Sequence, residues 1–248
     1  MLEQLPYCGL PPSPAELLAR FNLDPVLLLA LAGFAAVHCS RPISRSARWY
    51  AGAGWLVASI AFVSPLCALS VSLFSARVAQ HMILVLIAAP LIAEALPLRQ
   101  RTHCSRWLWI GAALFMGALW FWHMPRPYDA TFRSTSLYWA MHFSLFGSAI
   151  LLWRELLHHA RDCTVDALLL GALTSIQMGL LGAVLTFAGH PLFLWHLTTT
   201  APWGFTPLRD QQLGGVFMWV PGIALFLYAI LRSLRKLCAT LEEPARPV

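Results

Sequence analysis

The chain alternates long apolar stretches with short polar connections, and this pattern predicts a bundle of helices. Each stretch is continuously apolar, which argues against the apolar-polar alternation of a membrane β-strand. A helix of about 20 residues crosses a hydrocarbon core roughly 30 Å thick. We therefore predict an all-α membrane protein with seven transmembrane helices. The predicted spans are Pro25–Cys39, Trp49–Leu66, Val78–Leu96, Trp107–Trp122, Leu137–Trp153, Ala167–Phe187 and Gly214–Leu231.

The composition agrees with a membrane protein. Hydrophobic residues make up 58% of the chain and charged residues only 11%, whereas soluble domains carry about 25% charged residues. We expect no signal peptide over the first residues, because Glu3 is acidic and prolines follow it closely. We expect an external N-terminal segment over residues 1–24, one membrane domain over residues 25–233 and a cytoplasmic tail over residues 234–248.

The basic residues predict the orientation of the bundle. One side of the membrane receives 12 of them: Arg41, Arg45, Arg48, Arg99, Arg101, Arg106, Arg154, Arg161, Arg232, Arg235, Lys236 and Arg246. The other side receives five: Arg20, Arg77, Arg126, Arg133 and Arg209. The side richer in Lys and Arg is normally cytoplasmic, which places the N-terminus outside and the C-terminus inside. The net charge of +6 is thus explained by topology and anionic lipid, and we expect no nucleic-acid partner.

The six cysteines show no pattern that indicates a special function. None of them forms a CxxC motif, so neither a zinc ribbon nor a redox-active dithiol is indicated. Buried cysteines are usually inert, and we interpret most of these as packing residues.

Histidine and methionine are neighbours at three places near the ends of apolar stretches. The pairs are His81-Met82, His123-Met124 and Met141-His142. All three histidines fall within roughly 10 Å of the predicted outer surface, at 1.5 Å per helical residue. Because consecutive helices are usually neighbours, we expect His81, His123 and His142 to converge in an outward-facing pocket.

This residue set favours copper over harder metal ions. Imidazole binds first-row transition metals, and thioether sulfur selects Cu(I). We therefore predict His81, His123 and His142 as metal ligands, with Met82, Met124 and Met141 as additional candidates. Neighbouring His and Met cannot both point inward from one helix face, so only some of the methionines qualify. The alternative is that each histidine bonds a carbonyl or a water at the interface.

Two further outer stretches carry polar residues that would surround the site. Asp129 lies in "PYDATFR", and Asp210 and Gln211 lie just before the last span. Asp210 suits either an N-cap or the orientation of a metal-binding histidine. The following Gly214-Gly215 pair would let two helices approach closely. The preceding loop, which contains His190 and His196, suits a lid or a docking surface.

Four stretches of the chain together form a recognisable pattern. They are "SPLCALSVSLFSARVAQHMILVLIAAPLI", "WHMPRPYDATF", "MHFSLFGSAILLW" and "DQQLGGVFMWVPG". On these residues the chain resembles the CtaG family of cytochrome c oxidase assembly factors, the multi-span kind linked to caa-type oxidases. The resemblance extends from the second span to the seventh. It implies a multi-pass protein of the bacterial plasma membrane that helps to mature the oxidase by supplying copper. The positions that it carries over are His81, His123, Asp129, His142, Asp210 and Gln211.

Two positions depart from the family pattern. The family typically shows HMxQH, where this chain has Arg77 in place of the first histidine. It also shows HxxEH, where this chain has Tyr138 and Met141. Residues 77 and 81 share a helix face, as do residues 138 and 142. A cation at position 77 should weaken a metal site, and Arg77 could instead pair with Asp129 or Asp210 or contact lipid phosphate.

We expect an assembly factor that is no enzyme, handles a copper ion and docks onto cytochrome c oxidase subunits. An external copper donor would be a further partner. A haem-binding protein with two axial histidines and a purely structural scaffold for oxidase assembly are alternatives. A copper transporter is disfavoured, because it would need polar or soft groups at mid-membrane. The only candidates there are Glu94, Gln177 and Met178, and we expect Glu94 near the cytoplasmic end. A retinal protein is disfavoured by the absence of Lys from the spans.

Overall fold

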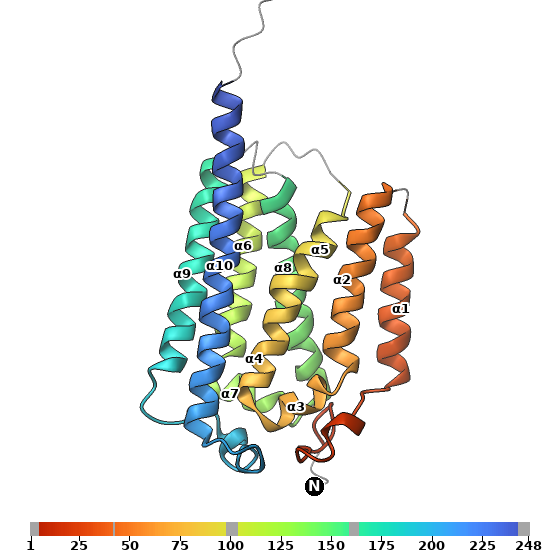
Figure 1. Cartoon of the computed structure of the whole chain (residues 1–248), viewed down its shortest axis with the longest axis vertical. Helices are drawn as coiled ribbons and strands as arrows, with labels where there is room; N and C mark the ends of the chain where they lie inside the picture. Colours follow the sequence, from red (N-terminus) through yellow and green to blue (C-terminus); the bar gives the residue numbers. More distant parts are fainter. Residues whose placement is uncertain (1–4, 42, 98–103, 159–163, 243–248) are drawn as a thin grey trace, which may run out of the picture.

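Each of the seven predicted apolar segments is largely helical in the computed structural model. The structure describes residues 5–41, 43–97, 104–158 and 164–242, and its regular structure within these ranges is entirely helical. Six long helices stand side by side (Figure 1): α1 (Pro25–Cys39), α2 (Arg45–Val63), α6 (Cys104–Trp122), α8 (Thr135–His158), α9 (Thr164–Thr186) and α10 (Pro207–Glu242).

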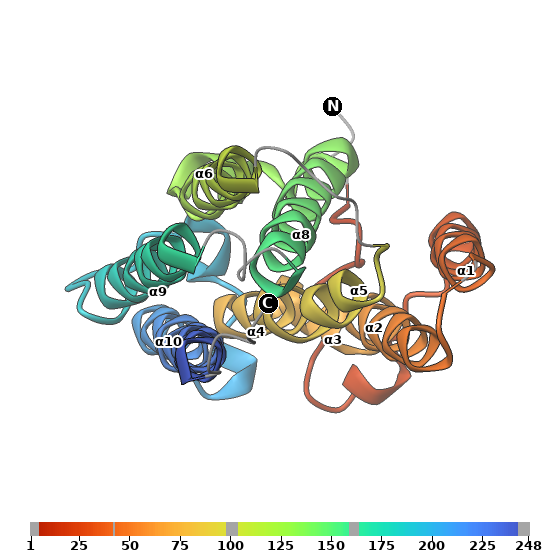
Figure 2. The same cartoon turned by 90° about the horizontal axis from the view of Figure 1, so that it is seen from above.

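The third predicted span is a composite helix near the middle of the bundle. It runs through α4 (Phe74–Ile83), the π-helical segment η2 (Leu84–Ala88) and α5 (Ala89–Glu94). Seen from above, α4 and α5 lie between α8, α10 and α2, whereas α1 lies at the edge beside α2 (Figure 2). The central position explains why the side chains of α4 are almost all buried. The shorter elements are α3 (Leu66–Ser72), α7 (Pro125–Ala130), η1 (Leu17–Ala19), η3 (Leu194–Leu197) and η4 (Ala201–Trp203).

Three helices in the described residues are long and apolar enough to cross a membrane. They are Phe74–Glu94, Thr135–His158 and Val165–Thr186. A fourth span results if α2 and α3, which meet at a bend of 47°, count as one. α1 is apolar but shorter, with 15 residues. The helices therefore agree with a membrane protein, and the count of seven spans stays a prediction.

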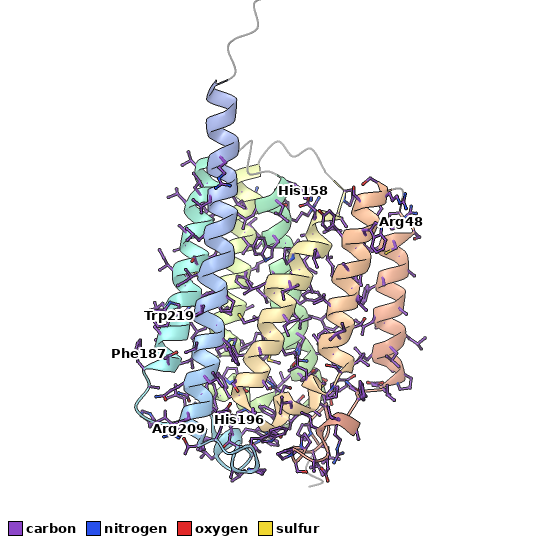
Figure 3. All side chains as sticks on the ribbon, viewed as in Figure 1. Arg48, His158, Phe187, His196, Arg209 and Trp219 are labelled. Carbon is purple, nitrogen blue, oxygen red and sulfur yellow. A yellow bond between two sulfur atoms is a disulfide. The ribbon has the colours of Figure 1, made fainter. Side chains whose placement is uncertain are left out.

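The two ends of the bundle carry different residues. Arg48 and His158 lie at one end, and His196 and Arg209 lie at the opposite end (Figure 3). We call the second end the N-terminal end, because the segment 5–24, α3, α7 and the loop 187–206 cover it (Figure 1). This separation agrees with the sides to which the sequence assigned these residues. Arg99, Arg101, Arg161, Arg246 and the end of the predicted tail, 243–248, lie outside the described residues.

The glycines before the last span bring three helices into close contact. A Cβ atom on Gly215 would lie 2.6 Å from the carbonyl oxygen of Gly182 in α9, closer than real Cβ atoms approach. A Cβ atom on Gly214 would lie 2.5 Å from the ring of Phe74 at the start of α4. The expected close approach at Gly214 and Gly215 is therefore confirmed.

Two of the six cysteines have a role that the sequence pattern did not indicate. A disulfide joins Cys8 in the N-terminal segment to Cys67 in α3. The two residues are 59 positions apart in the sequence, so no local spacing rule could have paired them. The same segment is held by Tyr7, whose hydroxyl donates to Asp24 at 2.5 Å. Asp24 in turn accepts from the backbone N–H of Val26 and caps α1.

Candidate functional site

The structure brings the three predicted histidines together from three helices. His81 lies in α4, His123 follows the end of α6, and His142 lies in the second turn of α8. The ring of His81 is in edge contact with both others, with centroids 5.6 Å from His123 and 5.2 Å from His142. Each of the three is at most 4% exposed. We call this group the histidine cluster.

Four ring nitrogens of the histidine cluster are buried without a hydrogen-bond partner. They are Nδ1 and Nε2 of His81, Nε2 of His123 and Nε2 of His142. An unpaired buried polar group normally costs about 1–3 kcal/mol. Four of them in one place therefore require an explanation, and a missing ligand is one.

A backbone hydrogen bond holds His123 and His142 each in one tautomer. Nδ1 of His123 lies 2.7 Å from the carbonyl oxygen of Leu119, and Nδ1 of His142 lies 2.9 Å from that of Tyr138. A carbonyl only accepts, so each Nδ1 carries the proton and each Nε2 keeps its lone pair. Metal-binding histidines are typically fixed in this way by a hydrogen bond from the other ring nitrogen.

Contacts from neighbouring helices position the helix of His81. The side chain of Gln80 donates to the carbonyl of Ala61 in α2 at 2.8 Å. One turn after His81 along the same composite helix, the carbonyl of Val85 accepts from the indole of Trp153 in α8 at 2.8 Å. Val85 lies in the π-helical segment, where the regular α-helical hydrogen bonds are interrupted. These contacts fix α4 against α2 and against the helix of His142.

Asp210 positions the same helix from its other end. The chain is extended at Leu73, and α4 then begins without a side-chain cap of its own. The carboxylate of Asp210 accepts from the backbone N–H groups of Phe74, at 2.6 Å, and Ser75, at 3.1 Å, and from the Ser75 hydroxyl. Asp210 is thus a cap supplied by α10 to α4, and its carboxylate bonds no histidine in these contacts.

Asp129 and Gln211 bind the loop 187–206. The carboxylate of Asp129 accepts from the backbone N–H groups of Leu194 and Trp195 at 3.2 and 3.3 Å. Gln211 accepts from the N–H of Leu192 at 2.7 Å. Both residues therefore hold the loop at the N-terminal end of the bundle rather than a histidine ring.

His196 fixes the same loop to the bundle. Its Nδ1 lies 3.2 Å from the carbonyl oxygen of Ser72, and its Nε2 accepts from the Tyr128 hydroxyl at 2.8 Å. Burial lowers the pKa of His196 to about 3. The loop thus forms a closed cover held by a neutral, fully bonded histidine.

Arg77 lies one turn before His81 and is 1% exposed. Its Nη1 donates to the hydroxyl of Thr131 at 2.7 Å. The guanidinium carbon lies 3.9 Å from the ring centre of Phe132 and 5.7 Å from that of Tyr138. Cation–π contacts of this kind stabilise a desolvated cation by roughly 2 kcal/mol.

The ion pair suggested for Arg77 does not form. Asp129 and Asp210 are used by the loop and by α4, and the described residues contain one salt bridge, Arg20–Glu16. Arg77 is therefore a buried cation in an aromatic cage, next to the histidine cluster.

The methionines lie in different environments. Met82 and Met141 are buried in the hydrophobic core at 5% and 0% exposure, whereas Met124 is 49% exposed. The part of the chain that the structure describes contains no group of three or more His, Cys, Asp or Glu already arranged around a metal position. The cluster therefore offers the donors of a metal site without the closed ligand geometry, and metal binding stays a prediction.

Sequence reasoning missed three contributors to this region: the Cys8–Cys67 disulfide, Trp153 and the trans-acting cap by Asp210. These contacts reach α3, η2 and α4, respectively. No sequence signal predicts them, because the two residues of each contact are more than 50 positions apart.

Comparison with protein families gives one match. A family model described as cytochrome c oxidase caa3 assembly factor (Caa3_CtaG) matches residues 28–239. Neither the curated proteins nor the solved structures that were compared contain a match.

Proposed function

The chain belongs to the cytochrome c oxidase caa3 assembly factor family, and we propose that it supplies copper to the oxidase from the histidine cluster. The observation that supports this most is the set of four buried imidazole nitrogens without a partner. Imidazole lone pairs are good ligands for copper, and a bound ion would satisfy these nitrogens.

The three histidines would hold copper as cargo rather than as a resident cofactor. His123 and His142 present Nε2 with the tautomer already fixed, and His81 lies between them with both nitrogens unpaired. Small changes in ring orientation then bring the nitrogens to the bond length of about 2 Å that metal–imidazole contacts require. Met82 and Met141 are the buried thioethers that remain as additional ligands, and Met124, half exposed, suits a first contact with incoming copper.

We propose that the protein is a multi-pass protein of the plasma membrane with its N-terminal end outside. Disulfides form and persist mainly outside the cytosol, and Cys8–Cys67 lies at this end. The site would then receive copper from an external donor. The partner would be an oxidase subunit, which the chain loads without catalysing a reaction.

A haem between two histidines is less well supported. Two axial imidazoles need ring centres roughly 6 Å apart, from two metal–nitrogen bonds of about 2 Å and the size of each ring. The centroids of His81 and His142 are 5.2 Å apart and their rings meet edge to face. A Soret band in the visible spectrum of the purified protein would favour haem.

Deletion of the gene tests the proposal. We expect the oxidase polypeptides to be present with underfilled copper centres, and excess external copper to restore part of the copper content. His81→Ala and His142→Ala should reproduce the deletion, because each removes one ligand of a small site. His158→Ala is the matched control, since this histidine bonds the carbonyl of Ala93 far from the cluster.

Normal oxidase activity and copper content in both cluster variants would reject the copper proposal. The chain would then act as a structural scaffold for oxidase assembly, and the loop 187–206 would be the surface to examine next.

A further inference from the structure

Tyr138 lies between the Cys8–Cys67 disulfide and the histidine cluster. The hydroxyl oxygen of Tyr138 is 3.4 Å from Sγ of Cys8 and 3.7 Å from Sγ of Cys67. The ring of Tyr138 packs on the ring of His142 with centroids 4.3 Å apart. Tyr138 therefore contacts both sulfur atoms and one imidazole of the cluster.

The two sulfur atoms have unequal surroundings. Cys67 is fully buried, whereas Cys8 is partly exposed at the N-terminal end. The Tyr138 hydroxyl lies within hydrogen-bond distance of both sulfur atoms and does not distinguish them. Sγ of Cys67 also accepts from the side-chain amide of Asn22 at 3.5 Å, because a disulfide sulfur has no hydrogen to donate. Donors of this kind stabilise a thiolate, so Cys67 is the better leaving group and Cys8 the better point of attack.

A positive charge also contacts Tyr138. The guanidinium carbon of Arg77 is 5.7 Å from the ring centre of Tyr138, and the described residues give Arg77 no carboxylate partner. Reactive cysteines typically occupy electropositive, partly exposed positions. A disulfide that only joins two segments requires none of these features.

We propose that Cys8 and Cys67 form an exchangeable disulfide whose reduced form binds Cu(I) and passes it to the histidine cluster. This inference rests on the proposed copper function. Two thiolates are soft ligands that select Cu(I). Copper would enter at the partly exposed Cys8, and Tyr138, which contacts both sulfur atoms and the ring of His142, would separate the sulfur pair from the histidine cluster by one side chain.

The redox step uses a dithiol reductant from outside. One reductant thiolate attacks Sγ of Cys8, the S–S bond breaks, and its electron pair leaves on Cys67. The second reductant thiol then attacks the mixed disulfide, which releases Cys8 and leaves the reductant as a disulfide. Cu(I) replaces the two thiol protons, which pass to water.

The test uses the full chain in detergent with Cys39, Cys104, Cys163 and Cys238 replaced by serine, so that only the proposed pair remains. One portion is reduced with dithiothreitol under anaerobic conditions and freed of reductant, and another is kept oxidised. Both are titrated with Cu(I) against a competing chelator and examined by X-ray absorption. We expect the reduced protein to bind one Cu(I) more per chain than the oxidised protein, with sulfur scattering that Cys8→Ser/Cys67→Ser abolishes.

Variants of the histidines separate this inference from the proposed function. His81→Ala/His142→Ala should keep the sulfur-bound copper of the reduced protein even if the cluster fails to bind. Loss of the nitrogen-bound copper alone would therefore leave the sulfur site standing. Equal stoichiometry and no sulfur scattering in the folded, reduced protein would overturn it and leave a structural disulfide.

A rate measurement tests the role of Tyr138 as a positioning residue. Tyr138→Phe removes only the hydroxyl, and we expect dithiothreitol to reduce the disulfide about tenfold more slowly, because a donor within reach of both sulfur atoms is lost. Tyr50→Phe, at a half-exposed tyrosine of α2, is the control. An unchanged rate in Tyr138→Phe would contradict the proposed activation of the disulfide by Tyr138.

Discussion

Arg77 is the residue that most distinguishes the histidine cluster from a group of histidines alone. Its guanidinium lies one helical turn from His81, where the family pattern has another imidazole. A fixed positive charge opposes a bound cation, and it opposes Cu(II) twice as strongly as Cu(I). The aromatic cage lowers the cost of burying this charge without removing the repulsion. The site should therefore be weak enough to release copper and selective for the monovalent ion.

Arg77→His should tighten Cu(I) binding by at least tenfold. Residues one turn apart have Cβ atoms about 6 Å apart, and a unit charge within roughly 10 Å is worth more than about 1.4 kcal/mol at an effective dielectric of 20. The substitution also adds an imidazole. Competition with a Cu(I) chelator measures the affinity, and Arg133→His at an exposed arginine is the control. Unchanged or weaker affinity in a folded Arg77→His protein would contradict the electrostatic argument.

The position of α4 depends on groups that other helices supply. Its first amides are bonded by Asp210 of α10, and its later turns are bonded to α2 and α8. Damage to any of these contacts should move His81 relative to the other two rings. Such changes would affect stability and copper binding together.

Asp210→Asn should destabilise the protein by roughly 2 kcal/mol, because an amide cannot accept from all three donors that the carboxylate serves. Thermal unfolding in detergent measures the change. Asp166→Asn is the matched control. Asp166 also lies in the first turn of a helix, but it accepts one hydrogen bond near the surface, from the indole of Trp109. We expect its effect to stay within about 0.5 kcal/mol. Equal effects of the two substitutions would show that the trans-acting cap has no special importance.

The loop 187–206 should loosen on acidification. The pKa of His196 is lowered to about 3 in the folded protein, against about 6.5 when unfolded. The folded loop thus binds fewer protons, so its stability is complete above pH 6.5 and falls as the pH drops toward 3. Linkage gives a loss of about 2 kcal/mol between pH 7 and pH 5.

Hydrogen exchange of peptides from the loop measures this opening free energy. His196→Gln should abolish the pH dependence, whereas His190→Gln, at an exposed histidine of the same loop, should keep it. A pH dependence that persists in His196→Gln would assign it to another group.

The sequence predicts the helices of this protein better than the hydrogen-bond and disulfide partners of individual side chains. Apolar runs place the long helices, because burial in lipid requires continuous apolar sequence. Their order also predicts that His81, His123 and His142 come close, since consecutive helices tend to pack together.

Sequence pattern could not predict which groups bond across the bundle. Asp210 was expected to cap its own helix or to orient a histidine, but the extended residue Leu73 leaves the amides of α4 unbonded, and α10 supplies the cap. The pairing of Cys8 with Cys67 likewise depends on how the N-terminal segment folds over α3. Both contacts depend on tertiary packing, which no local spacing encodes.

The distribution of charge and the disulfide make one joint prediction about the whole molecule. Reporter fusions after Arg45 should read cytoplasmic, and fusions within Trp203–Arg209 should read external. The described residues place these positions at opposite ends of the bundle (Figure 3). A reversed pattern would move the histidine cluster and the disulfide to the reducing side and contradict copper supply from outside.

The π-helical segment Leu84–Ala88 has a consequence for how the gene can change. A π-helical turn holds one residue more than the α-helical turn it replaces, and each residue of an α-helix turns the chain by about 100°. Deletion of one codon in this stretch keeps the reading frame, but it rotates the helix before the deleted residue relative to the helix after it. Either His81 would leave the other two rings or the following turns would lose their packing. Point substitutions here are thus easier to accommodate than a single-residue deletion, and the length of this helix is under stricter constraint than the identity of its side chains.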